Sequence, residues 1–231
     1  MHCGLFFQLQ SLPLSSHSEN TMENIRIRLA EERDIPAMLA VYAPYVEETA
    51  VSFEYAVPSP EEFSSRLARV QESYPWIVAE QKGRVLGYAY ASRFHPRAAY
   101  DWSVETSIYV QREARGRGLG PRLYEALEAM LRAQNVLSAY ACIALSETPD
   151  EYLDHASIRF HERMGYRLTG TFPNCGYKFE RWYGMVWMEK RLVPASAPAS
   201  LKPAPLVAFS SVQENFFPPD APSRTAFTAQ P

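Results

Sequence analysis

The sequence has few cysteines and no long apolar run, and both absences exclude classes of protein. Three cysteines occur among 231 residues, Cys3, Cys142 and Cys175, and their spacing matches no metal-ligand pattern. An odd number of scattered cysteines suits a reducing cytoplasm, so we expect a cytoplasmic protein that holds no metal. No apolar stretch reaches the roughly 20 residues of a membrane-spanning helix, so we expect no membrane partner.

Charge of one sign is not concentrated anywhere in the chain either. The formal net charge is −3 and no long basic run is present, so nucleic acid is not an expected partner. Cys142 lies in the apolar run 140–145, which predicts a small buried side chain and not a nucleophile. These bulk properties agree with a small soluble protein of one domain.

Both ends of the chain differ in composition from its middle. Residues 1–22 lack the basic start and long apolar stretch of a secretory signal, and translation from Met22 would remove most of them. Residues 193–231 hold eight of the 18 prolines, no glycine and few charges. We therefore expect a disordered extension at 1–22, a folded domain at 23–192 and a disordered tail at 193–231.

Strand and helix patterns alternate between these ends, and no internal repeat is visible. Residues 25–29 alternate as a strand, and Asp34 is expected to cap a helix with Pro36 in its first turn. Residues 76–79 and 85–91 read as two strands of a hairpin that turns at Gly83. Helical patterns are expected at 60–73, from 119 onward and at 154–164, and strands at 102–110, near 136 and at the end of the domain. The pattern predicts a mixed α/β sheet with helices on both faces.

A glycine-rich turn between the strand-like run 102–110 and the helix that follows it is the most informative segment. Its residues are Arg115, Gly116, Arg117, Gly118, Leu119 and Gly120. Strand, turn and helix in this order direct backbone N–H groups and a positive helix end toward one anion. A P-loop would need a lysine after the glycines, and a dinucleotide fingerprint would need the spacing G-x-G-x-x-G. The segment therefore predicts a phosphate site of another kind.

The pattern R-x-x-G-x-G from Arg115 to Gly120 resembles the pyrophosphate signature of the GNAT superfamily of acyl-CoA-dependent N-acetyltransferases. Segments 74–80, 100–110, 157–166 and 176–179 resemble the phosphinothricin and methionine sulfoximine acetyltransferase group, and the similarity covers roughly 25–192. The resemblance implies a largely antiparallel sheet whose middle strands splay apart. It also implies acetyl-CoA as co-substrate and the amine of a small amino acid or analogue as acceptor.

The resemblance further implies the residues of the site. Glu105 stands at the position of the general base, and His161 stands where a side chain lies near the cofactor sulfur, as a proton donor, a relay or a wall of the pocket. Besides the six residues of the glycine-rich turn, the expected cofactor contacts are Ile108, Tyr109, Val110, Asp154 and Ser157. A backbone N–H near Val110 is expected to polarise the thioester. The expected substrate contacts are Phe53, Glu54, Arg93, Ala98, Ala99, Tyr100 and Lys178.

Two departures from the family and several alternatives stay open. Pro121 stands where a serine or threonine is usual, and Asp154 stands where an asparagine is usual. A peptide N-terminus or a polyamine is an alternative acceptor, and the acidic loop 147–151 favours a polyamine mildly while the arginines oppose it. A non-catalytic acyl-CoA-binding module is the alternative outside enzymes. Aromatic residues at 177–187 could wall a pocket, line a homodimer contact or fill strand positions.

Overall fold

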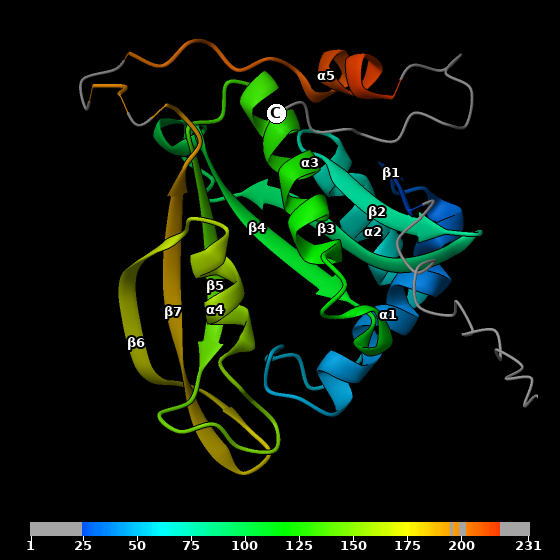
Figure 1. Cartoon of the computed structure of the whole chain (residues 1–231), viewed down its shortest axis with the longest axis vertical. Coiled ribbons are helices and arrows are strands. Elements are labelled where there is room, and N and C mark those ends of the chain that lie inside the picture. The colour runs from blue at the N-terminus through cyan, green and yellow to red at the C-terminus, as the bar shows by residue number, and fades with distance from the viewer. Residues whose placement is uncertain (1–24, 195, 199–201, 218–231) are drawn as a thin grey trace, which may run out of the picture.

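The computed structural model describes residues 25–194, 196–198 and 202–217 (Figure 1). The expected extension at 1–22 lies outside them. The strands are β1 (Ile25–Leu29), β2 (Trp76–Gln81), β3 (Arg84–Arg93), β4 (Ser103–Val110), β5 (Ser138–Leu145), β6 (Arg167–Lys178) and β7 (Arg181–Arg191). The helices are α1 (Ile35–Glu47), α2 (Pro60–Gln71), α3 (Leu119–Ala133), α4 (Ala156–Arg163) and α5 (Phe209–Phe216), with 3-10 turns at Glu32–Asp34, Ala98–Tyr100 and Arg112–Ala114.

The seven strands form one sheet in the order β1-β2-β3-β4-β5-β7-β6. All neighbouring strands run antiparallel except β4 and β5, which are parallel. This parallel pair is joined in register only at Ser103–Ser138, Val104–Ala139 and Glu105–Tyr140. Beyond these pairs the two strands diverge, as Figure 1 shows. The predicted mixed, largely antiparallel sheet with splayed middle strands is confirmed.

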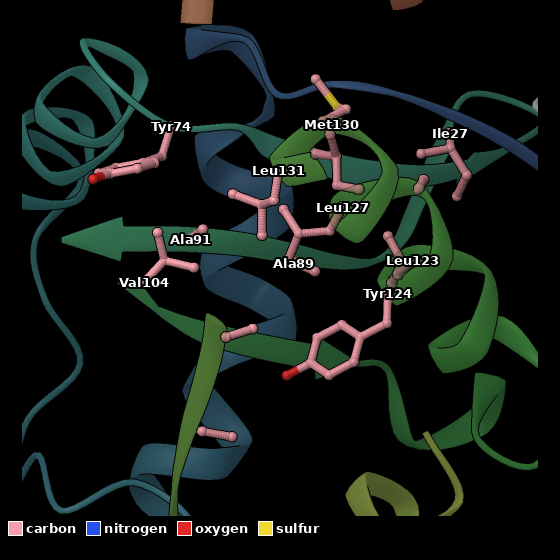
Figure 2. Close-up of a cluster of buried hydrophobic side chains, with 14 of the residues drawn as sticks. Ile27, Tyr74, Ala89, Ala91, Val104, Leu123, Tyr124, Leu127, Met130 and Leu131 are labelled. Atoms are coloured by element: carbon pink, nitrogen blue, oxygen red, sulfur yellow. The ribbon is translucent and has the colours of Figure 1, made fainter. Parts of the chain in front are cut away.

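Helix α3 covers one face of the sheet because its apolar residues recur at helical spacing. Leu123, Leu127, Met130 and Leu131 are fully buried, as the sequence pattern predicts. Figure 2 shows these side chains packed over the small residues of β3 and over Val104 of β4. Burying one such side chain contributes about 1.5–3 kcal/mol to folding, so this stripe fixes α3 to the centre of the sheet.

Helices α1 and α2 cover the opposite face over β2, β3 and β4. Ser59 caps α2 by accepting a hydrogen bond from the Glu62 backbone N–H at 3.2 Å. Asp34 stands at the N-cap of α1, but its side chain does not form the expected cap bond. Its carboxylate instead accepts hydrogen bonds from both terminal nitrogens of Arg28, at 2.6 and 2.8 Å. A buried bidentate ion pair outweighs a single cap bond, so Asp34 ties α1 to β1 instead.

The prediction of disorder in the tail is wrong for residues 202–217. Phe209 and Val212 of α5 are buried against α3 and belong to the same apolar cluster. The segment before α5 is also bound, because the Trp102 indole N–H donates to the Ala204 carbonyl at 2.7 Å and the Val207 N–H donates to the Gln134 carbonyl at 3.1 Å. Proline density does not exclude a short helix placed between the prolines.

We expect Phe209→Ala to lower the free energy of unfolding by about 1–3 kcal/mol, because it empties a buried contact between α5 and α3. Leu206→Ala is the matched control, since Leu206 is 38% exposed, and it should change stability by less than about 0.5 kcal/mol. Denaturant unfolding of the full chain measures both. Equal stability of the two variants would show that α5 does not dock.

Candidate active site

A slot opens through the sheet where β4 and β5 stop pairing. Residues from both strands line it, together with side chains from α3 and α4 and from the loops that follow α1 and precede α4, and it holds about 60 Å³. Alternation along β4 turns Thr106 and Ile108 toward α3 and turns Ser107 and Tyr109 toward α1. The slot is therefore reached from both faces of the sheet. The lining residues are Val51, Thr106, Ser107, Ile108, Tyr109, Tyr124, Ala141, Cys142, Ile143, Ala144, Leu153, Ser157 and His161.

His161 forms one wall of the slot with Tyr124, and its protonation follows from its neighbours. Its Nδ1 lies 2.8 Å from the Ser157 carbonyl oxygen, which can only accept, so Nδ1 carries a proton. Its Nε2 lies 2.9 Å from Tyr124 Oη. Burial lowers the pKa of His161 to about 4, against a smaller opposing effect of the Ser157 bond, so the ring is neutral. Nε2 is therefore an acceptor, and Tyr124 donates to it.

Glu105 lies on the opposite face of the sheet, at the last paired position of β4 and β5. Its register partners are Ser92 of β3 and Tyr140 of β5. The side chain is half-buried and forms no ion pair within the described residues. Burial raises the pKa of Glu105 above its ordinary value, and nearby His95 opposes the shift. A carboxylate with a raised pKa beside a slot is suited to accept a proton.

The glycine-rich turn enters α3 with two residues in the left-handed region. Gly116 and Gly118 have φ of 73° and 72°, which side chains other than glycine adopt at a cost. Gly118 is the N-cap of α3, and no side chain caps the helix. The start of α3 thus lacks a side-chain cap and lies beside exposed Arg115 and Arg117, an arrangement that suits an anion. At Gly120 a Cβ atom would lie 2.8 Å from the Phe160 ring, so this glycine lets α3 and α4 pack closely.

The comparison with known families decides what this arrangement belongs to. The family described as "Acetyltransferase (GNAT) domain" matches residues 27–187. The chain belongs to the GNAT acetyltransferase family. The resemblance to this family, first indicated by the turn at Arg115–Gly120, is thereby confirmed.

Individual GNAT relatives are similar over most of their length. The phosphinothricin N-acetyltransferase of Streptomyces viridochromogenes is 35% identical over 179 residues, which cover 78% of this chain and 94% of the relative. An L-methionine sulfoximine/L-methionine sulfone acetyltransferase of Pseudomonas paraeruginosa is 35% identical over 178 residues, covering 74% and 98%. A GNAT superfamily phosphinothricin acetyltransferase from Sinorhizobium meliloti, solved in complex with AcCoA, has a TM-score of 0.69 at 31% identity, covering 78% and 93%.

A larger hollow lies between α2 and the face of the sheet formed by β2 to β4. Tyr109 borders both this hollow and the slot. The hollow holds about 420 Å³. Its floor is aromatic, with Trp76 and Tyr90 stacked at 4.1 Å, and Ser92 stands at its edge opposite Glu105. Arg66 and Arg69 of α2 stand at its rim. A space of this size, with an aromatic floor and charged residues at its rim, is typical of a small-molecule site.

Of the predicted substrate contacts, Glu54 does not line this hollow but binds Arg66, which does. One of its oxygens accepts from Arg66 at 2.7 Å, and the other is buried without a hydrogen-bond partner among the described residues. Phe53 instead contacts Tyr183 and the backbone at Gly176, where an added Cβ would lie 2.3 Å away. Arg93 is half-exposed, 3.9 Å from Asp101, and Ala98, Ala99 and Tyr100 form an exposed 3-10 turn.

Lys178, a predicted substrate contact, is bonded within the fold. It is 3% exposed, and its Nζ donates to the carbonyl oxygens of Val46, Thr49 and Ser52 at 2.7, 2.9 and 2.7 Å. These bonds use all three donors of an ammonium. Arg181 is occupied as well, because its guanidinium binds Asp150 and Glu151.

Two of the expected cofactor contacts also have hydrogen-bond partners within the fold. The Val110 N–H, near which the polarising donor was expected, donates to Tyr45 Oη at 3.1 Å, and that hydroxyl donates to the Val110 carbonyl. Asp154 is exposed, and its Oδ1 accepts from the Ala156 N–H at 2.7 Å, so it supports the start of α4. Ile108, Tyr109 and Ser157 do line the slot.

The prediction that Cys142 is buried is wrong. The side chain is exposed, because alternation along β5 directs Ala141 and Ile143 toward the helices and Cys142 to the other face. Partial burial and the nearby Glu105 raise the pKa of Cys142 to about 11, so the thiol stays protonated near neutral pH. The second half of the prediction, that Cys142 is no nucleophile, agrees with this environment.

Sequence reasoning missed Tyr124, Tyr45 and Arg66. Tyr124 lies beside the apolar stripe of α3 and reads as one more core residue until α4 brings His161 to it. Tyr45 reaches Val110 across 65 positions of the chain, and Arg66 reads as a surface residue of α2. No local pattern distinguishes these residues, since each acquires its role through a distant partner.

We expect Lys178→Met to lower the free energy of unfolding by about 2–4 kcal/mol, because it leaves three carbonyl groups without their donor. Lys82→Met, at an exposed turn, is the control and should have little effect. Thermal unfolding measures stability, and the KM for the amine below the melting range measures substrate binding. A stable Lys178→Met with a raised KM would restore the predicted substrate contact.

Proposed function

We propose that this GNAT enzyme transfers the acetyl group of acetyl-CoA to the amine of a small amino acid or amino-acid analogue, of the phosphinothricin and methionine sulfoximine kind. One observation carries the proposal: Glu105, half-buried with a raised pKa, lies where a slot opens between β4 and β5. The names of the relatives in Streptomyces viridochromogenes and Pseudomonas paraeruginosa support the class of acceptor.

In the proposed binding mode, the cofactor pyrophosphate lies at the backbone amides of Gly116, Gly118 and Gly120, with Arg115 and Arg117 beside it. The uncapped start of α3 supports this, because Pro121 supplies neither an N–H nor a hydroxyl and the turn itself must supply the donors. The pantetheine arm lies along Ile108 and Tyr109, which line the slot. This orientation brings the thioester toward Glu105.

The acceptor amine lies in the hollow that borders the slot at Tyr109. Glu54, which is ion-paired with Arg66 at the rim, adds negative charge beside the ammonium group. Arg69 is exposed and forms no ion pair within the described residues, so it is available for a carboxylate, phosphinate or sulfoximine oxygen. This mixed charge fits an amino acid better than a polyamine.

Acetyl transfer requires the ammonium to lose a proton before its nitrogen attacks. Glu105 takes that proton, and its raised pKa brings its basicity closer to what neutral pH demands. The attack forms a C–N bond, and the C–S bond then breaks with its electron pair on sulfur. The thiol product follows when that sulfur is protonated.

We further propose that the enzyme is a cytoplasmic homodimer. The β6–β7 hairpin exposes Leu168, Phe172, Tyr177 and Trp182, and large apolar side chains grouped on one hairpin are typical of an interface. In the part of the chain that the structure describes, no helix is long and apolar enough to cross a membrane. Sedimentation equilibrium tests the dimer, and a monomer at micromolar concentration would overturn it.

We expect Glu105→Gln to lower the maximal rate at neutral pH by roughly 10²–10³-fold, with acetyl-CoA affinity changed only a few-fold. The base must be ionised, so the rate of the natural enzyme should fall as the pH drops through the raised pKa of Glu105. High pH should partly rescue the variant, because the amine then arrives deprotonated. Thiol release from acetyl-CoA measures the rate across a panel of amino acids, sulfoximines, polyamines and peptides. An unchanged single-turnover rate would exclude Glu105 as the base.

We expect Gly118→Val to weaken acetyl-CoA binding at least tenfold, because a side chain at φ near 72° distorts the turn. Gly83→Val is the matched control: Gly83 has φ of 78° in the hairpin turn, far along the chain from α3, with no atom within 4 Å of an added Cβ. It should cost similar stability and leave binding unchanged. Calorimetry with excess acetyl-CoA measures both, and no heat with the natural protein would refute the cofactor.

A further inference from the structure

We propose that Tyr124 and His161 form a proton shuttle that carries a proton from the acceptor nitrogen to the departing sulfur. Tyr124 is the catalytic residue in contact with the reacting atoms, and His161 holds the proton between the two steps. The inference rests on the proposed acetyl transfer. It adds a residue of α3 to the site and gives His161 a role different from that of a simple proton donor.

The directions of the hydrogen bonds exclude direct donation by His161. Nδ1–H points to the Ser157 carbonyl at 2.8 Å, and the neutral ring has no proton on Nε2. Nε2 accepts from Tyr124 Oη at 2.9 Å. His161 therefore cannot protonate a sulfur unless it first receives a proton, and the atom placed to deliver one is Tyr124 Oη.

The neighbouring hydroxyl groups of Thr106 and Tyr166 form a chain that touches Tyr124 at one point, but the single proton of Tyr124 goes to the nearer acceptor, His161 Nε2. Thr106 Oγ1 donates to the Tyr140 carbonyl at 3.1 Å, and Tyr166 Oη lies 3.3 Å from Thr106 Oγ1. Tyr124 Oη is farther from Thr106 Oγ1, at 3.4 Å, than from His161 Nε2. Tyr124 and His161 both line the slot, whereas Tyr166 does not belong to its lining. Tyr124 thus offers the slot an oxygen with free lone pairs, backed by a proton acceptor.

The proposed steps balance. The ammonium first gives one proton to Glu105. As the nitrogen bonds to the thioester carbon, it gives a second proton to Tyr124 Oη, and the Tyr124 hydroxyl proton passes to His161 Nε2. The C–S bond then breaks with its electron pair on sulfur, the sulfur takes the hydroxyl proton of Tyr124, and Nε2 returns its proton to Oη. An amide and a thiol result, and both residues are neutral again.

The surroundings favour a concerted transfer. Burial raises the pKa of Tyr124 well above its ordinary value, so a free tyrosinate is costly, and simultaneous transfer to His161 avoids it. A protonated His161 would donate to Ser157 and to Tyr124, so both of its N–H groups have acceptors. Its lowered pKa makes this state short-lived, and a thiolate with an ordinary pKa of about 8.5 is a stronger base that takes the proton. Nitrogen and sulfur are bonded to the same carbon in the intermediate, so one hydroxyl can serve both.

Tyr124→Phe and Tyr166→Phe test the shuttle as a matched pair. Each removes one buried hydroxyl from rings that contact His161, at centroid distances of 5.4 and 5.2 Å. We expect Tyr124→Phe to lower the single-turnover rate about 10–100-fold and Tyr166→Phe to lower it less than threefold. His161→Phe should match Tyr124→Phe, and the double variant should fall no further, because the two residues act as one unit.

Rates in mixtures of H₂O and D₂O separate the shuttle from a structural effect. A step that moves two protons together gives a curved dependence on deuterium fraction in the natural enzyme, and Tyr124→Phe should make it linear. Equal rates for Tyr124→Phe and Tyr166→Phe, or a curve that persists in Tyr124→Phe, would overturn the shuttle while acetylation itself continues. A natural enzyme that acetylates no amine of the panel would instead overturn the proposed function, and the shuttle with it.

Discussion

The early end of pairing between β4 and β5 is the constraint on which the rest of the structure depends. Two strands that diverge leave backbone N–H and C=O groups without ladder partners, and such groups are costly when they are shielded from water. Side chains replace the missing bonds at both ends of the gap. Thr106 Oγ1 binds the Tyr140 carbonyl where the ladder stops, and Tyr45 Oη binds both the N–H and the carbonyl of Val110 where β4 ends. The gap is therefore a stabilised part of the fold.

The sheet also separates the titrating groups of the site. Glu105 faces α1 and α2, where burial raises its pKa, and His161 faces α3, where burial lowers its pKa. Desolvation acts in opposite directions because it disfavours the charged form of each. Glu105 is suited to accept a proton before the attack, and His161 can hold a proton only briefly. These two properties suit two different proton transfers about one carbonyl carbon.

Features determined by neighbours in the chain were predictable from the sequence. The glycine-rich turn, the apolar stripe of α3 and the alternation of β4 each follow from spacing over a few residues. The environments of Lys178, Cys142 and α5 were not predictable from such spacing. Lys178 binds the turn after α1, and α5 packs on the end of α3, so both depend on segments far away in the chain. For Cys142, no local pattern specified which face of β5 its side chain lies on. A lysine in a strand reads as a surface charge until three carbonyl groups converge on it.

The attachment of the C-terminal segment determines how mechanical load reaches the site. Trp102 stands at the junction from which β4 and β5 diverge, since its carbonyl accepts from the N–H groups of Leu137 and Ser138 and its indole holds the Ala204 carbonyl. A force applied beyond α5 first loads the packing of Phe209 and Val212 on α3, and then the bond from Trp102 at the point where β4 and β5 diverge. A force applied at Ile25 loads β1, the strand at one edge of the sheet. For immobilised enzyme or single-molecule stretching, the two ends are therefore not equivalent points of attachment.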